Sequence, residues 1–187
     1  MAEVNKWHVQ LAAEVIAGGG VIAYPTEAVW GLGCDPYDEE AVRYLLHIKQ
    51  RPVEKGMILV SGQIEHFAPW VEALSDPQRD RVLGSWPGPV TWLLPDVVGI
   101  PHWVKGDHHK VALRVTAHPL VAALTERLGG PIISTSANPA GRKPARSALR
   151  VRQYFPVELD GLMPGTLGGQ RSPTPIYDIE TGQTVRG

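Results

Sequence analysis

The spacing of hydrophobic residues predicts helices interleaved with strands along the whole chain. Apolar residues recur at helical spacing in residues 5–17 and again from Glu39 to about Lys49, where Asp38 can cap the helix and Pro52 can end it. Further helices are expected at 77–84, 118–128 and 147–155, strands at 21–24, 57–61, 90–94, 111–115 and 131–135, and a closing hairpin where IYDIE meets QTVR. Strands that alternate with helices indicate an α/β fold, and the many proline turns favour a mixed rather than an all-parallel sheet.

Length and composition suit one domain, or one domain with a lobe, over residues 1–187. The chain has 187 residues, 43% of them hydrophobic and 20% charged, which excludes a disordered polyelectrolyte. Glycine (20) and proline (17) are frequent but spread along the chain, without repeats or a low-complexity linker. We therefore expect a loop-rich globular domain whose site is built from turns.

The charge distribution is uneven although the net charge is only −1. Residues 1–40 carry seven acidic side chains against Lys6 alone, whereas the stretch between Glu126 and Glu158 has no acid. That stretch carries six basic residues, namely Arg127, Arg142, Lys143, Arg146, Arg150 and Arg152. It suits phosphate or another anion, although a solvated helix face would look the same.

Other features favour a cytoplasmic protein without common catalytic motifs. Cys34 stands alone, so it forms no intrachain disulfide, and we interpret it as a small buried filler. No signal-peptide core or membrane span is apparent, and neither a P-loop, a GxGxxG fingerprint nor an HExxH pattern is present. His108 and His109 fall in a predicted loop and are expected at the surface.

Three segments carry polar groups that composition does not explain. YPTEAVWG (24–31) follows a strand with a hydroxyl and a carboxylate, KQRPVEKG (49–56) places three cations on a constrained loop, and STSANPAG (134–141) follows another strand. Each has an ordinary explanation: a capped turn, basic residues at a helix C-terminus, and an Asx or Ser/Thr turn. Together, the cations and hydroxyls could instead hold a polyphosphate and a small polar ligand.

These segments, with SWPGPVTWLLP and VALRVTAHPL between them, occur in the order typical of one family. The chain resembles the YrdC-like family, the single-domain bacterial threonylcarbamoyl-AMP synthases, over about residues 7–187. Its signature pairs are Lys49/Arg51 and Ser136/Asn138, while Ala28, Lys55 and Thr135 depart from the family's commonest residues. The resemblance implies a twisted, mixed parallel/antiparallel sheet with flanking helices and a concave basic cavity.

The resemblance also implies an activity: a nucleotidyltransferase that joins L-threonine, bicarbonate and ATP into threonylcarbamoyl-AMP. ATP would be a substrate that carries Mg²⁺, with no metal ligand from the protein and no covalent nucleophile. The expected ATP-binding residues are Lys49, Arg51, Lys55, Ser136, Asn138, Arg146 and Arg186. The expected threonine-binding residues are Thr26, Arg114, Ser134 and Thr174, with Arg114 on the carboxylate.

Elementary chemistry agrees with this expectation, because carbamate, carboxylate and triphosphate are all anions that cations and fixed donors must bring together. The product would serve tRNA modification through a separate transferase complex, so tRNA is an indirect partner, and direct RNA contact is possible. The alternative is a module that binds double-stranded RNA or tRNA without turnover. RNA binding needs exposed cations, but it does not need the set of hydroxyls and amides.

Overall fold

The computed structural model describes residues 5–170 and 172–186, with the side chain of Arg186 left out. In this part of the chain, nine strands form one sheet in the order β7-β1-β2-β6-β3-β5-β4-β8-β9. The strands are β1 (Ile22–Pro25), β2 (Trp30–Gly33), β3 (Ile58–Ser61), β4 (Thr91–Pro95), β5 (Lys110–Val115), β6 (Ile132–Ser136), β7 (Gly161–Leu162), β8 (Ile176–Asp178) and β9 (Thr184–Arg186). The pairs β1–β7, β3–β5 and β4–β8 are parallel and the others antiparallel, so the predicted mixed sheet is confirmed.

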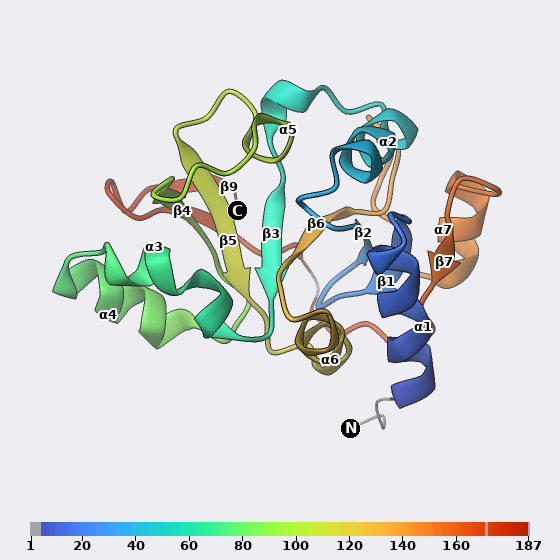
Figure 1. Ribbon diagram of the computed structural model, residues 1–187, viewed down its shortest axis with the longest axis horizontal. Coiled ribbons are helices and arrows are strands. Elements are labelled where there is room, and N and C mark those ends of the chain that lie inside the picture. Colours follow the sequence, from blue (N-terminus) through green and yellow to red (C-terminus); the bar gives the residue numbers. More distant parts are fainter. Residues whose placement is uncertain (1–4, 171, 187) are drawn as a thin grey trace.

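Seven α-helices and two short 3₁₀ helices flank this sheet in the described residues (Figure 1). They are α1 (Lys6–Ala17), α2 (Glu39–Lys49), α3 (Ala68–Glu72), α4 (Asp76–Ser85), α5 (His102–Lys105), α6 (Pro119–Leu128), α7 (Ala148–Tyr154), η1 (Val53–Lys55) and η2 (Ile64–Phe67). The helices and strands predicted from the sequence are all present, whereas β2, β7, α3 and α5 were not predicted. None of the helices in the described ranges is long and apolar enough to cross a membrane.

The two ends of α2 illustrate how the local sequence sets the boundaries. Asp38 caps the helix as predicted, accepting a hydrogen bond from the Ala41 amide at 3.0 Å. The other end lies at Lys49, as predicted, although Gln50 rather than Pro52 ends the helix. Gln50 takes the left-handed conformation (φ 53°), and the amide of Arg51 donates to Leu46 O at 2.9 Å. The turn at Gln50 directs Arg51 and the following loop away from the helix axis.

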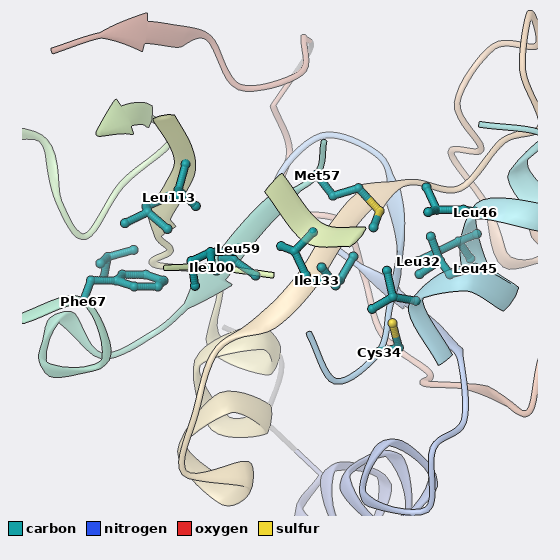
Figure 2. Close-up of a cluster of buried hydrophobic side chains, with 14 of the residues drawn as sticks. Leu32, Cys34, Leu45, Leu46, Met57, Leu59, Phe67, Ile100, Leu113 and Ile133 are labelled. Atoms are coloured by element: carbon teal, nitrogen blue, oxygen red, sulfur yellow. The ribbon is translucent and has the colours of Figure 1, made fainter. Parts of the chain in front are cut away.

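The main core lies on one face of the central strands. Leu59, Leu113 and Ile133 occupy matching positions on β3, β5 and β6, and all three are fully buried. Figure 2 shows this cluster extending from Phe67 to the α2 leucines Leu45 and Leu46.

The opposite face of the sheet is divided in two. At one end, Val60 and Ile132 pack against α6, which lies beside α1 (Figure 1). Further along the same face, the alternation of side chains turns Ile58, Ala112 and Ser134 into an open cavity. One face of the sheet therefore supplies stability, and part of the other supplies a binding space.

Candidate active site

The cavity has a volume of about 600 Å³, which is within the usual range for a small-molecule site. The cavity extends along the neighbouring parallel strands β3 and β5, in which Ile58 is paired with Ala112 and Val60 with Arg114. Lys110 begins β5, so it lies about 13 Å from Arg114 along the strand at roughly 3.3 Å per residue. The lining residues thus form two ends, which differ in burial and charge.

The first end, called the closed end here, contains the four residues predicted to bind threonine. Thr26, Arg114, Ser134 and Thr174 all line the cavity and are only 5–6% exposed. Thr26 closes the β1–β2 turn, where its hydroxyl donates to Val29 O at 2.7 Å. Arg114 Nη1 donates to the Thr174 hydroxyl at 2.7 Å. Segments that are far apart in the sequence therefore meet around one guanidinium group.

Glu27 is a member of the closed end to which the sequence assigned no role. Its Oε2 lies 3.6 Å from Arg114 Nη2, and its Oε1 accepts a hydrogen bond from the Thr116 hydroxyl. Both charged groups are nearly buried, so the carboxylate offsets the cost of burying the arginine. The pair is longer than a hydrogen bond, and Glu27 Oε2 and Arg114 Nε have no hydrogen-bond partner. Arg114 is thus held in place with part of its donor capacity unused.

The second end, called the basic end here, is lined by Arg51, Lys55, Lys105 and Lys110, with His108 and His109 at its edge. The predicted cations Arg51 and Lys55 lie in this end, and Arg51 Nη2 donates to Gly56 O at 2.7 Å. Lys105 and Lys110 were missed because only the tertiary fold brings them beside the 51–56 loop. His108 and His109 are exposed in a loop, as predicted, although they also face the cavity.

Acidic partners hold the two additional lysines. Lys105 Nζ lies 2.6 Å from Asp96, and Lys110 Nζ lies 2.7 Å from Asp178 and also contacts Glu180. The hydrogen bonds that Lys110 donates to Asp178 and Glu180 raise its pKa, which keeps it charged at neutral pH. Two of the four cations at the basic end are therefore fixed in place by carboxylates, and one of these, Asp178, also lines the cavity.

The remaining predicted ATP-binding residues are divided between the cavity and its surroundings. Ser136 lines the cavity, whereas Lys49 and Asn138 lie behind the lining and Arg146 is exposed outside it. Arg146 Nη2 donates to Gln170 O at 3.5 Å. The side chain of Arg186 lies outside the described part of the chain. The roles given to these residues stay predictions.

Lys49 has an unusual environment for a lysine. Its side chain is 4% exposed, and its Nζ donates to the main-chain oxygens of Ser136 and of Asn138, the latter at 2.9 Å. Burial, with a smaller contribution from the charge of Arg51, lowers the pKa of Lys49 to about 7. Its amine is thus used within the protein rather than directed at the cavity.

Cys34 is fully buried in the core, as predicted for a filler residue. Burial, followed by the charges of Asp35 and Asp38, raises the pKa of its thiol. The thiol therefore stays protonated at neutral pH, which makes it a poor nucleophile. Nothing in its surroundings gives it a role in chemistry at the cavity.

Comparisons with known proteins agree with this geometry. The Sua5–YciO–YrdC family profile, described as "Telomere recombination", matches residues 14–186. Proteins named threonylcarbamoyl-AMP synthase from Stutzerimonas stutzeri and Pseudomonas savastanoi pv. phaseolicola are 55% and 57% identical over 183 residues, which cover 98% of this chain and 98% of each relative.

Two solved structures extend the comparison to the fold. The crystal structure of P. abyssi Sua5 complexed with L-threonine matches with a TM-score of 0.89 and 27% identity over 97% of this chain, which spans about half (54%) of that longer protein. E. coli YciO matches with a TM-score of 0.84 and 25% identity over 97% of this chain and 89% of its own. A profile match over nearly all residues, close relatives of equal length and a shared fold lead to one conclusion: the chain belongs to the Sua5–YciO–YrdC family.

Proposed function

We propose that this protein is a threonylcarbamoyl-AMP synthase, which converts L-threonine, bicarbonate and ATP into threonylcarbamoyl-AMP and pyrophosphate. The relatives that share more than half of its residues over nearly its full length carry this name. The single structural observation that carries the proposal is a cavity with two unlike ends. One end is small, buried and rich in hydroxyl groups, and the other is lined by cations.

Threonine is placed at the closed end. The Arg114 guanidinium group lines this end and its Nε has no hydrogen-bond partner, while Thr26, Ser134 and Thr174 add hydroxyl groups around it. The crystal structure of P. abyssi Sua5 complexed with L-threonine supports an amino-acid site in this family. A buried arginine that is already oriented binds a carboxylate with a smaller loss of side-chain entropy than an exposed one.

ATP is placed with its phosphates at the basic end, near Arg51, Lys55, Lys105 and Lys110. Mg²⁺ would enter with the phosphates rather than through protein ligands. The cavity acids Glu27 and Asp178 are already paired with Arg114 and Lys110, and no three His, Cys, Asp or Glu side chains of the described chain gather around a possible metal position. When bound, Mg²⁺ would offset phosphate charge.

The reaction itself needs no covalent intermediate on the enzyme. The threonine ammonium group and bicarbonate give a carbamate, water and a proton, and a carbamate oxygen then displaces pyrophosphate from the α-phosphate of ATP. All the reacting groups carry negative charge at this stage, so the cations lower the barrier by reducing their repulsion. The closed end would hold the amino acid and the basic end would hold the pyrophosphate leaving group. Holding both brings the reacting atoms together.

The test is pyrophosphate release measured with each substrate omitted in turn. Release should require ATP, threonine and bicarbonate together, and mass spectrometry should identify threonylcarbamoyl-AMP. Pyrophosphate release without threonine or without bicarbonate would contradict the proposal, as would a trapped acyl- or phosphoryl-enzyme.

We further propose that the product serves the modification of tRNA through a separate transferase, so that tRNA is not a direct substrate of this chain. The alternative of an RNA-binding module depends on exposed cations such as Arg150 and Arg152 of α7, which lie outside the cavity. Affinity for double-stranded RNA that persists at physiological salt, without any turnover, would favour that alternative.

A further inference from the structure

The turn that follows β6 is fastened to the end of α2 through one residue, Lys49. The Lys49 ammonium group donates to the carbonyl oxygens of Ser136 and Asn138, and the Lys49 carbonyl accepts from the Ala140 amide at 2.9 Å. Three contacts thus join one residue to both sides of a five-residue turn. The two segments are more than 80 positions apart in the sequence.

The same turn forms part of the cavity wall. Ser136 lines the cavity at the residue where β6 ends. The turn also closes on itself, because Asn138 Nδ2 donates to Arg142 O at 2.8 Å and the Ala145 amide donates to Ala137 O at 3.0 Å. Ser136 is paired with Gly31 of β2 on one side, and Lys49 fastens the residues that follow it to the end of α2.

The energetics favour a structural use of the Lys49 amine. A carbonyl group that loses its donor in a buried position costs about 1–3 kcal/mol, and Lys49 serves two such groups. Even an uncharged amine retains two N–H bonds, enough for both carbonyls, so these contacts do not require the positive charge. A phosphate contact would require the side chain to abandon both carbonyls and cross the lining.

We propose that Lys49 is a positioning residue, which holds the 136–140 turn so that Ser136 faces the nucleotide, and that it does not itself bind phosphate. This inference rests on the proposed function for the identity of the nucleotide. It departs from the direct phosphate contact that the family resemblance implies for Lys49. It assigns phosphate contact to cations that do line the cavity, such as Lys55.

The decisive experiment is amide hydrogen exchange on the nucleotide-free protein. Lys49→Met keeps the length and apolar stem of the side chain but removes its donors, and Lys55→Met is the matched control at an exposed cavity lysine. Lys49→Met should speed exchange of the Ala140 and Ala145 amides at least about tenfold, the change that corresponds to about 1.4 kcal/mol of local opening. Lys55→Met should leave these amides unchanged.

ATP binding gives a second readout. We expect both variants to bind ATP more weakly, but only Lys55→Met should reduce the dependence of ATP affinity on salt concentration, because it alone removes a charge that faces the phosphates. Unchanged exchange in nucleotide-free Lys49→Met together with a reduced salt dependence would overturn the proposal.

A measurement on the unaltered protein covers the case in which Lys49→Met fails to fold. In ¹³C NMR of labelled lysines, the Lys49 ε-carbon should not shift when ATP is added, whereas the Lys55 signal should. An ATP-induced shift at Lys49 comparable to that at Lys55 would reject the positioning role. The exchange result does not depend on turnover, so the proposed reaction could fail without affecting this inference.

Discussion

The two ends of the cavity solve different recognition problems. At the closed end, Arg114 is buried, paired with Glu27 and hydrogen-bonded to Thr174, so its direction is fixed before any ligand arrives. At the basic end, Lys55 is exposed on a short loop, and Lys105 and Lys110 are held by acids at the edge. The first arrangement recognises a small ligand by the direction of its hydrogen bonds. The second recognises a larger anion mainly by charge.

Burial, rather than residue type, separates the roles of the two ends. Arginine occurs at both ends, yet Arg114 is 5% exposed, whereas Arg51 lies on a loop and donates to the carbonyls of Lys55 and Gly56. Interactions in a buried site are weakly screened, so their loss is expensive. Substitutions at the closed end should therefore have larger and more selective effects than those at the basic end.

The largest effect is expected for Arg114→Met. The change removes the proposed carboxylate partner and leaves Glu27 buried without its counter-charge, so threonine binding should weaken by about 2–5 kcal/mol. Calorimetry with threonine and with ATP distinguishes effects at the two ends of the cavity, because the affinity of this variant for ATP should change much less than its affinity for threonine. A variant that is folded by circular dichroism and binds threonine normally would remove Arg114 from the amino-acid site.

Arg51→Ala should have an intermediate effect, of about 1–3 kcal/mol on ATP binding, because a charged hydrogen-bond donor to phosphate is lost. Threonine affinity should remain near the unaltered value. Arg43→Ala is a suitable control, since Arg43 lies on α2 and pairs with Glu39 at the surface. Equal ATP affinities for the Arg51 and Arg43 variants would show that Arg51 does not face the nucleotide.

The pKa of Lys49 predicts an effect on stability rather than on ligand binding. Its value of about 7 lies below that of an exposed lysine, so the folded protein resists protonation at this position. Between about pH 7 and pH 10, the unfolded chain carries this proton and the folded protein does not. The free energy of unfolding, relative to that of Lys49→Met, should therefore rise with pH by up to about 1.4 kcal/mol per unit. Urea unfolding at pH 7 and pH 9 measures the difference, and a constant difference would mean that Lys49 stays protonated.

The smallest effect on turnover is expected for Cys34→Ser. The thiol is buried in the core and is not among the residues that line the cavity, so kcat should stay close to that of the unaltered protein. The introduced hydroxyl lowers stability by leaving a polar group in an apolar site, which Cys34→Ala would not do. A folded but inactive serine variant would show that the cysteine has a role in the reaction.

Much of the fold could be predicted because its signals are local. Asp38 marks the start of α2, and apolar runs such as residues 111–115 mark the central strands. The strand β2 was missed because its sequence, WGLG, has two glycines and no alternation of polar and apolar residues. Gly33 is required there because a Cβ would come within 2.5 Å of Ile133 O on β6, a contact that depends on tertiary structure.

The candidate site, too, has residues that the sequence predicted and residues whose role depends on tertiary contacts. The motif residues Thr26, Arg114, Ser134 and Thr174 do meet in one cavity, as the family resemblance predicted. Glu27 was visible in the same motif, but its use depends on pairing with Arg114 across the fold. The Lys49 position shows the limit of motif reasoning, because the sequence shows a cation beside Arg51 but not the carbonyls that bind it.

Amino-acid selectivity in pyrophosphate release tests most directly whether the closed end binds threonine. Threonine, serine and valine are compared at equal concentration with ATP and bicarbonate. Valine nearly matches threonine in shape but lacks the hydroxyl group that would hydrogen-bond to Thr26 or Ser134, so it should react near background, whereas serine should be disfavoured by about 1–3 kcal/mol for its missing methyl group. We expect the rates to fall in the order threonine, then serine, then valine. If valine matches threonine, the closed end does not recognise a hydroxyl group, and the placement of threonine beside Thr26, Ser134 and Arg114 is wrong.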